Sequence, residues 1–169
     1  KVNTVRGIPV FLNSSVFTLV LLVLLFSVWA FFRTRSRANA LFAGVCVCVL
    51  GYTCYPLLHT YLALRVQPWF SLEMLFYYLT FPAMLLLEHE ITGRKYKWVW
   101  WLVGFTAAAG IGATVAGIFA GGMETAALSY GVSAVTEVLK WFTAICLVVI
   151  AFFYTEGTRG LPLLAGTVL

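Results

Sequence analysis

The sequence predicts an all-α protein built from membrane-spanning helices. Of its 169 residues, 62% are hydrophobic and 10% are charged, whereas soluble domains average about 45–50% apolar and about 25% charged residues. A soluble chain of this length could not hide so much apolar surface, but lipid accepts apolar side chains that face outward. The composition therefore favours a single transmembrane domain, a polytopic helix bundle, over a soluble helical bundle.

The apolar residues form separate stretches of the length that crosses a bilayer, for which about 20 residues are needed. A sixth stretch begins at Leu161 and is still apolar at Leu169, so we expect the sequence to be a fragment of a longer protein. The five complete spans are expected at roughly 8–32, 38–64, 68–87, 98–120 and 128–154, with the sixth running from 161 to 169 and onward.

Local signals support the first three spans. The first is an unbroken apolar run that is too long for the core of a signal peptide. The second and third contain Pro56 and Pro82, and each proline removes an intrahelical hydrogen bond, which predicts a kinked or loosened helix. Pro68 suits the start of the third helix, where its missing N–H costs nothing. Gly93 is typical of a helix stop.

Small residues recur every four positions along the fourth span, at Ala109, Ala113, Gly117 and Gly121. A stripe of this kind lets another helix approach closely, either as a seam within the bundle or as a face between two copies of the chain.

Positive charge predicts the orientation of the helices. Lys and Arg number 11 against 6 acidic residues. By alternation of the spans, seven of them flank the ends of the first, third and fifth helices, and three flank the opposite ends. The side richer in Lys and Arg is normally cytoplasmic, so we expect the N-terminus outside. The same flanking pattern indicates a membrane protein and no nucleic-acid partner.

Ionisable residues inside a membrane are costly and mark candidate sites. Glu137 and Lys140 are three apart and share one face of the fifth helix, so they form either an ion pair or part of a ligand site. We expect an outward-opening pocket with aromatic walls, in the outer half of the bilayer or near its outer edge. Of the neighbouring Tyr77 and Tyr78, we expect one to point inward. The candidate ligand-binding residues are His59, Tyr55, Glu73, Tyr77, Glu137, Lys140 and Trp141.

The end of the third span carries three consecutive polar residues, Glu88, His89 and Glu90. Consecutive helix positions fan out by about 100° each, so they make a poor metal-ligand set, and a solvated helix end is expected. The sequence offers no nucleophile with a base, no phosphate-binding loop and no dinucleotide fingerprint. We therefore expect no enzyme, no metal and no cofactor in this segment.

Three motifs between about residues 19 and 101 resemble a known family. They are the basic link RTRSR (33–37), the aromatic-rich LGYTCYP (50–56) and the run FPAMLLLEHEITGR (81–94). Together they resemble the N-terminal seven-transmembrane sensor region of bacterial histidine kinases and related membrane signalling receptors.

The resemblance implies a sensory input module of the bacterial inner (plasma) membrane. Such a module perceives a small-molecule or lipid ligand, or a membrane state, and passes it to a cytoplasmic signalling domain, here beyond Leu169, with signalling expected through a homodimer. The buried Glu137 and Lys140 equally suit part of a transporter or channel for small molecules or ions, which stays open as an alternative.

Overall fold

The computed structural model describes the backbone of residues 2–62, 66–93, 96–119 and 123–154, and the side chains of residues 13–54, 58, 69–93, 96–119 and 130–151. The described chain is all-helical, and every helix contains a stretch long and apolar enough to cross a membrane. The expected fold class and five spans are therefore confirmed, whereas the sixth span lies outside the described residues. The helices are α1 (Val2–Thr34), α2 (Arg37–Leu62), α3 (Val66–Thr92), α4 (Lys97–Phe119) and α5 (Met123–Tyr154).

The expected boundaries of α2 and α4 hold to within two residues, whereas α1, α3 and α5 are longer than expected, and α1 begins at Val2 instead of at residue 8. Helix α3 continues to Thr92 instead of stopping at Leu87, and α5 begins at Met123 instead of Leu128. The stop of α3 is set by Gly93, whose φ of 66° is left-handed and whose N–H donates to the Glu90 carbonyl at 3.3 Å. The helix also includes Glu88, His89 and Glu90. Glutamate favours the helical state, and the His89 side chain accepts a hydrogen bond from the backbone of Tyr96.

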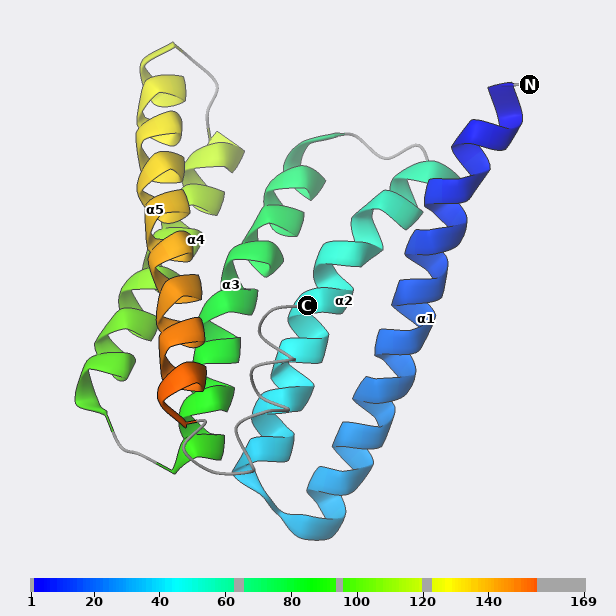
Figure 1. The fold of residues 1–169 in the computed structure, drawn as a ribbon. Helices are drawn as coiled ribbons and strands as arrows, with labels where there is room; N and C mark the ends of the chain where they lie inside the picture. The colour runs from blue at the N-terminus through cyan, green and yellow to red at the C-terminus, as the bar shows by residue number, and fades with distance from the viewer. Residues whose placement is uncertain (1, 63–65, 94–95, 120–122, 155–169) are drawn as a thin grey trace.

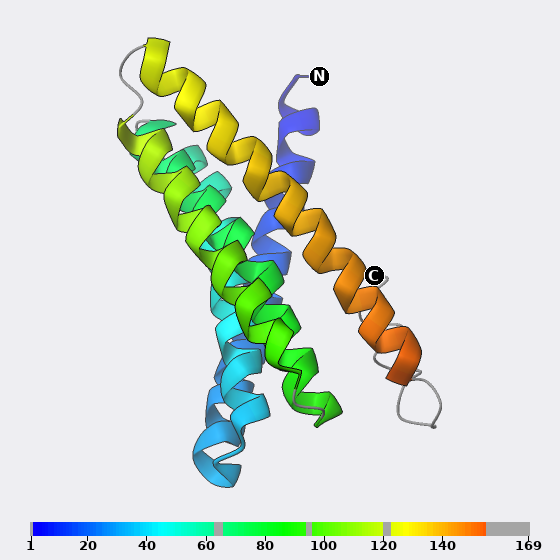
Figure 2. The ribbon, with the colours of Figure 1, turned by 90° about the vertical axis from the view of Figure 1, so that its left-hand side faces the viewer.

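The helices alternate in direction and follow one another across the molecule (Figure 1). Helix α1 packs on α2, α2 packs on α3, and α4 and α5 pack on the far side of α3. Figure 2 shows α5 lying along one side of the α3–α4 pair. Helix α3 is therefore the centre of the described bundle, because it contacts α2, α4 and α5.

The link between α1 and α2 is very short. Arg35 has a left-handed φ of 53°, and its N–H donates to the Phe31 carbonyl at 2.7 Å. The Asn39 side-chain amide then donates to the Thr34 hydroxyl at 2.9 Å, which joins the end of α1 to the start of α2. These bonds satisfy backbone groups that the end of a helix leaves free.

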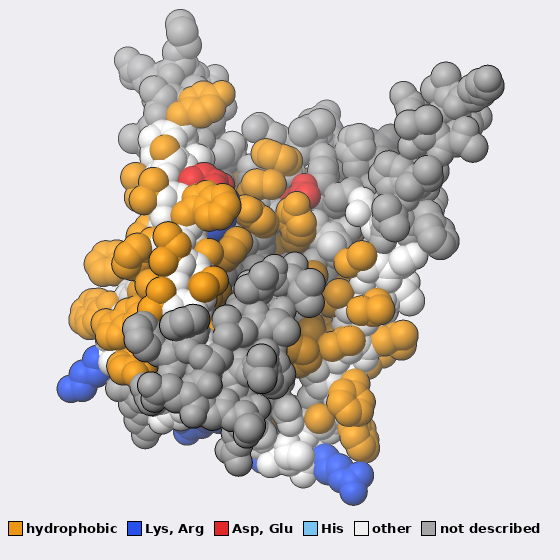
Figure 3. Space-filling view, viewed as in Figure 1, with side chains coloured by type: hydrophobic (Ala, Val, Ile, Leu, Met, Phe, Trp, Pro, Cys, Tyr) orange, Lys and Arg blue, Asp and Glu red, His pale blue; other side chains and the backbone are white. Residues whose placement is uncertain are grey.

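Large apolar side chains face outward along much of the molecule, as Figure 3 shows for one face. Trp101 and Phe119 of α4 are 72% and 75% exposed, and Val138 of α5 is 70% exposed. A soluble protein rarely displays such a continuous apolar surface. The surface suits contact with lipid, which imposes no penalty on it.

Basic side chains gather at the end of the bundle where α1 and α3 end and α2 and α4 begin. Arg33, Arg35, Arg37 and Lys97 are all exposed there, and Figure 3 shows blue side chains along the lower edge of the molecule. We call this the basic end.

Candidate functional site: a polar cluster between α3 and α5

An ion pair joins two residues of α5 in the middle of the bundle. The Lys140 Nζ pairs with the Glu137 Oε2, three positions earlier on the helix. The Lys140 Nζ also donates to the Tyr77 hydroxyl of α3 at 3.1 Å, and the Tyr78 hydroxyl donates to the Glu137 Oε1 at 3.4 Å. We call these four residues the polar cluster. Two of its polar contacts, Lys140 with Tyr77 and Tyr78 with Glu137, connect α5 to α3 across more than fifty positions of sequence.

The ammonium group of Lys140 is enclosed by aromatic rings. Its Nζ lies 5.0 Å from the ring centre of Tyr77, 5.2 Å from that of Trp141 and 6.0 Å from that of Phe81. A cation over ring faces at such distances is attracted by the negative face of the π-system, most strongly when water is excluded. Lys140 is accordingly buried, with its side chain 8% exposed.

The two members of the ion pair differ in exposure. The Glu137 side chain is 43% exposed, whereas that of Lys140 is 8% exposed. The pair lies deep in the span, because Lys140 is the eighteenth of the 32 residues of α5. Its ammonium group is therefore near the centre of the span and not near its edge. A partly exposed carboxylate at this depth is a candidate functional group, because ionisable residues inside a membrane are costly.

Both tyrosines of α3 reach the ion pair, so the expectation that only one of them points inward is wrong. Successive helix positions diverge by about 100°, which separates the two rings. Because α5 lies across the side of α3, it meets both hydroxyl groups. The rings of Tyr77 and Tyr78 are themselves 5.6 Å apart, and Tyr77 also contacts Tyr52 of α2 at 5.3 Å.

The structure brings together Tyr77, Glu137, Lys140 and Trp141 from the candidate residues. Glu73 is buried one turn before Tyr77 but does not join the ion pair. The side chains of Tyr55 and His59 lie outside the described residues. Sequence reasoning missed Tyr52 and Phe81, although Phe81 follows Tyr77 by four positions and so shares its face of α3.

Hydroxyl groups hold α5 to α4 on either side of the polar cluster. The fully buried Thr143 lies 3.3 Å from Thr106 of α4, measured between hydroxyl oxygens. Thr136 donates to the carbonyl of Ala109 at 3.2 Å. Such bonds between membrane helices contribute about 0.6–2 kcal/mol each. Helix α5 is thus joined to both of its neighbours by polar contacts.

The small residues of α4 face the chain's own helices in the described part of the stripe. A Cβ added to Gly117 would lie 3.2 Å from the Ser71 hydroxyl oxygen of α3, and Ala113 is buried. Ala109 receives the bond from Thr136 described above. Gly110, one position after Ala109, lies against the Cβ of Tyr78. Gly121 is outside the described residues.

The end of α3 differs from the solvated end that we expected. Glu90 is exposed, but Glu88 and His89 are 3% and 7% exposed. The His89 Nε2 accepts the backbone N–H of Tyr96 at 2.9 Å, and its ring lies 6.2 Å from that of Trp100. The imidazole therefore fastens the start of α4 to the end of α3. Among the described residues no group of three metal-ligating side chains occurs.

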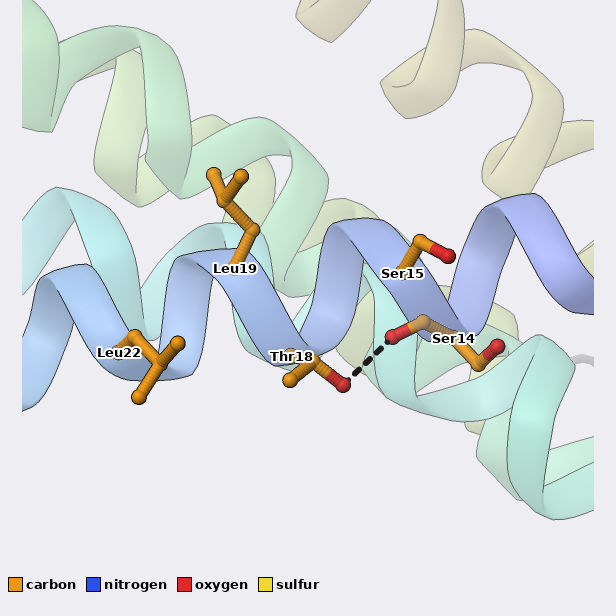
Figure 4. Close-up of a pocket in the computed structure, with 5 residues that line it drawn as sticks. All are labelled: Ser14, Ser15, Thr18, Leu19 and Leu22. Atoms are coloured by element: carbon orange, nitrogen blue, oxygen red, sulfur yellow. Dashed lines mark hydrogen bonds between the residues drawn. The ribbon is translucent and has the colours of Figure 1, made fainter.

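A surface hollow on α1 does not belong to the polar cluster. Its lining comes from α1 alone, and the Thr18 hydroxyl donates to the Ser14 carbonyl at 2.8 Å along its edge (Figure 4). A hollow on a single outward helix face resembles a lipid-facing groove more than an enclosed ligand site. The lining residues are Ser14, Ser15, Thr18, Leu19 and Leu22.

No protein-family model, curated protein or solved structure matches the chain. The class of protein follows from its own features: five helices long and apolar enough to span a membrane, with apolar side chains turned outward. The chain is a multi-pass helical membrane protein.

Proposed function

We propose that this chain is the sensory input module of a bacterial signalling receptor in the inner membrane. In this proposal a ligand or a change in the membrane alters the packing of α5 against α3. The change reaches a cytoplasmic output domain beyond Leu169 in a dimer of the protein. The polar cluster is the observation that carries the proposal.

The polar cluster supports a sensory role because a ligand could replace either of the two groups that bind Glu137, Lys140 and Tyr78. Glu137 presents a partly open carboxylate, while its counter-ion Lys140 is enclosed. A ligand that offers a hydrogen-bond donor or a cation to Glu137 would compete with Lys140 and with Tyr78. Because Lys140 and Tyr78 connect α5 with α3, such competition would favour a different packing of α5.

The basic end supports the proposed orientation. Four exposed basic residues lie where α1 and α3 end, and α5 ends on the same side by alternation. By the positive-inside rule this side is cytoplasmic and the N-terminus is outside. A movement of α5 would then be transmitted toward the cytoplasm.

The orientation is tested by cysteine labelling of whole cells. Ser36→Cys places a thiol in the link between α1 and α2. We expect no reaction with a membrane-impermeant maleimide added to intact cells, and strong reaction after permeabilisation. The unchanged protein supplies the background from the native cysteines, of which the described chain holds four, all free and within helices. Labelling of Ser36→Cys in intact cells would overturn the orientation.

The sensory role is tested in the full-length protein. Glu137→Gln leaves Lys140 without its counter-ion, and we expect the output activity to change by about fivefold or more, since allosteric coupling is commonly 1–3 kcal/mol. Glu90→Gln is the matched control, because it makes the same chemical change at an exposed residue and should leave the output unchanged. Equal output in both variants, or a full-length protein without a signalling domain, would refute the proposal.

A transporter is the second candidate, favoured by the same ion pair at mid-span, since ionisable residues at that depth also line ion and proton pathways. Flux measured with the purified protein in liposomes separates the two candidates. Transport that is abolished by Glu137→Gln and retained by Glu90→Gln would favour the transporter.

A further inference from the structure

The carboxyl group of Glu88 is buried without a hydrogen-bond partner. The residue is 3% exposed, and both of its side-chain oxygens lack any donor. Every other buried side-chain oxygen or nitrogen in the described part of the chain has a hydrogen-bond partner. Buried polar groups are bonded in the great majority of cases, so this group calls for a physical explanation.

An apolar junction of three helices surrounds the face on which Glu88 lies. Leu85, three positions earlier and therefore on the same face of α3, is fully buried. It packs in one core cluster with Val99 and Leu102 of α4 and Leu147 of α5. Ala151, one turn after Leu147, is also fully buried. Glu88 is thus a polar residue on the face of α3 that packs against α4 and α5.

The ionisable groups that the structure describes around Glu88 do not neutralise a charge on it. On α3, His89 uses its Nε2 to accept the Tyr96 N–H, and Glu90 is exposed. At the start of α4 Lys97 is exposed, and on the described part of α5 Cys146 packs against the core cluster of the junction. No ion pair to Glu88 is found in the described part of the chain.

The charged form of Glu88 would be strongly disfavoured in this position. An ionised carboxylate without a partner in an apolar surrounding costs far more than a neutral one. The C-terminal end of a helix, where Glu88 lies, adds a negative potential from the backbone carbonyls. The protonated carboxylic acid avoids both costs.

The position of Glu88 also gives its proton a route to water. It is the twentieth of the 24 residues of the span Trp69–Thr92. At 1.5 Å per residue, the edge of the span is about 6 Å away. A small separation of the helix ends would therefore admit water to the carboxyl group.

We propose that Glu88 is a proton-binding site that controls how the end of α3 packs against α4 and α5. With the proton bound, the neutral carboxyl group stays in the junction. When the proton leaves to water, the carboxylate draws water in and the three helix ends separate. This site is independent of the polar cluster, and the proposal holds for a sensor and for a transporter alike.

Infrared difference spectroscopy of the membrane-reconstituted protein tests the proposal directly. A protonated carboxyl group has a carbonyl-stretch band that a carboxylate lacks. We expect a band at about neutral pH that disappears as the pH is raised to about 9, well above the range of ordinary carboxyl groups. The band should be absent from Glu88→Gln and retained in Glu90→Gln, which alters an exposed carboxyl group of the same helix.

A band that Glu88→Gln does not remove, or no band at neutral pH, would overturn the proposal. So would a Glu88 band that persists unchanged to about pH 9, because the group would then never release its proton. If Glu88→Gln does not fold, Glu88→Asp serves instead, since it should move the band and not remove it. A change in output through the polar cluster would not affect this result, so the two proposals fail separately.

Discussion

Replacing Lys140 by methionine tests how strongly the polar cluster joins α5 to α3. Methionine keeps the length and apolar character of the lysine side chain but removes its charge. The substitution abolishes the ion pair with Glu137, the 3.1 Å hydrogen bond to Tyr77 and the contacts of the ammonium group with three aromatic rings. Glu137 is then left with the 3.4 Å bond from Tyr78.

The magnitude follows from the burial of the two side chains. Removing one partner of a buried pair usually costs about 3–5 kcal/mol, chiefly because the other charge stays buried and unpaired. Glu137 is 43% exposed, so the lower value applies, and we expect Lys140→Met to lower the free energy of unfolding by about 3 kcal/mol. Adding Glu137→Gln removes the stranded charge and should restore about 2 kcal/mol of this loss.

A double-mutant cycle measures this coupling. The free energy of unfolding is determined for the original protein, Lys140→Met, Glu137→Gln and the double variant. Unfolding by SDS in mixed micelles is followed by the loss of helical circular dichroism. If the effects of the two substitutions add to within about 0.5 kcal/mol, the ion pair does not join these residues energetically, and the reasoning from the polar cluster is refuted.

Glycines at two helix contacts give further predictions. Gly110→Ala places a Cβ 2.9 Å from the Cβ of Tyr78 and should lower stability by about 1–3 kcal/mol in the same assay, whereas Gly104→Ala meets no atom within 4 Å and should change it by less than about 1 kcal/mol. Similar losses in both variants would contradict the close approach of α4 to α3. A Cβ on Gly51 would overlap the base of the Phe76 ring, so Gly51→Ala should be strongly destabilising, and Phe76→Ala on the same chain should relieve part of the loss. Simple additivity of these two changes would argue against the contact between α2 and α3.

The helices themselves could be predicted because lipid leaves a chain few choices. Every backbone N–H and C=O must be satisfied within a span, and about 20 apolar residues are needed to cross the bilayer. Composition and run length therefore predicted five helices, although the third span was expected to end at Leu87 and α3 continues to the stop signal at Gly93. The proximity of Glu137 and Lys140 was also predictable, because three positions on one helix are neighbours whatever the rest of the fold does.

Contacts between helices could not be predicted in the same way. The helices are apolar on all sides, so the sequence pattern does not indicate which face meets a neighbour. That Tyr77 and Tyr78 both reach the ion pair depends on how α5 lies across α3. The burial of Glu88 and His89, which we expected to be solvated, depends on the packing of α4 and α5 over the end of α3.

The sequence by itself determined that this is a membrane protein with five complete spans, and that an acid and a base share one face of the fifth. Those features depend on composition and on neighbours within one helix. The tertiary structure decided that the ammonium group of Lys140 is enclosed by rings from α3 and α5, and that the Glu88 carboxyl group is buried without a partner. The first depends on residues more than fifty positions apart in the sequence, and the second on the meeting of three helices. The free energy of such contacts depends on distances that only the packed bundle determines.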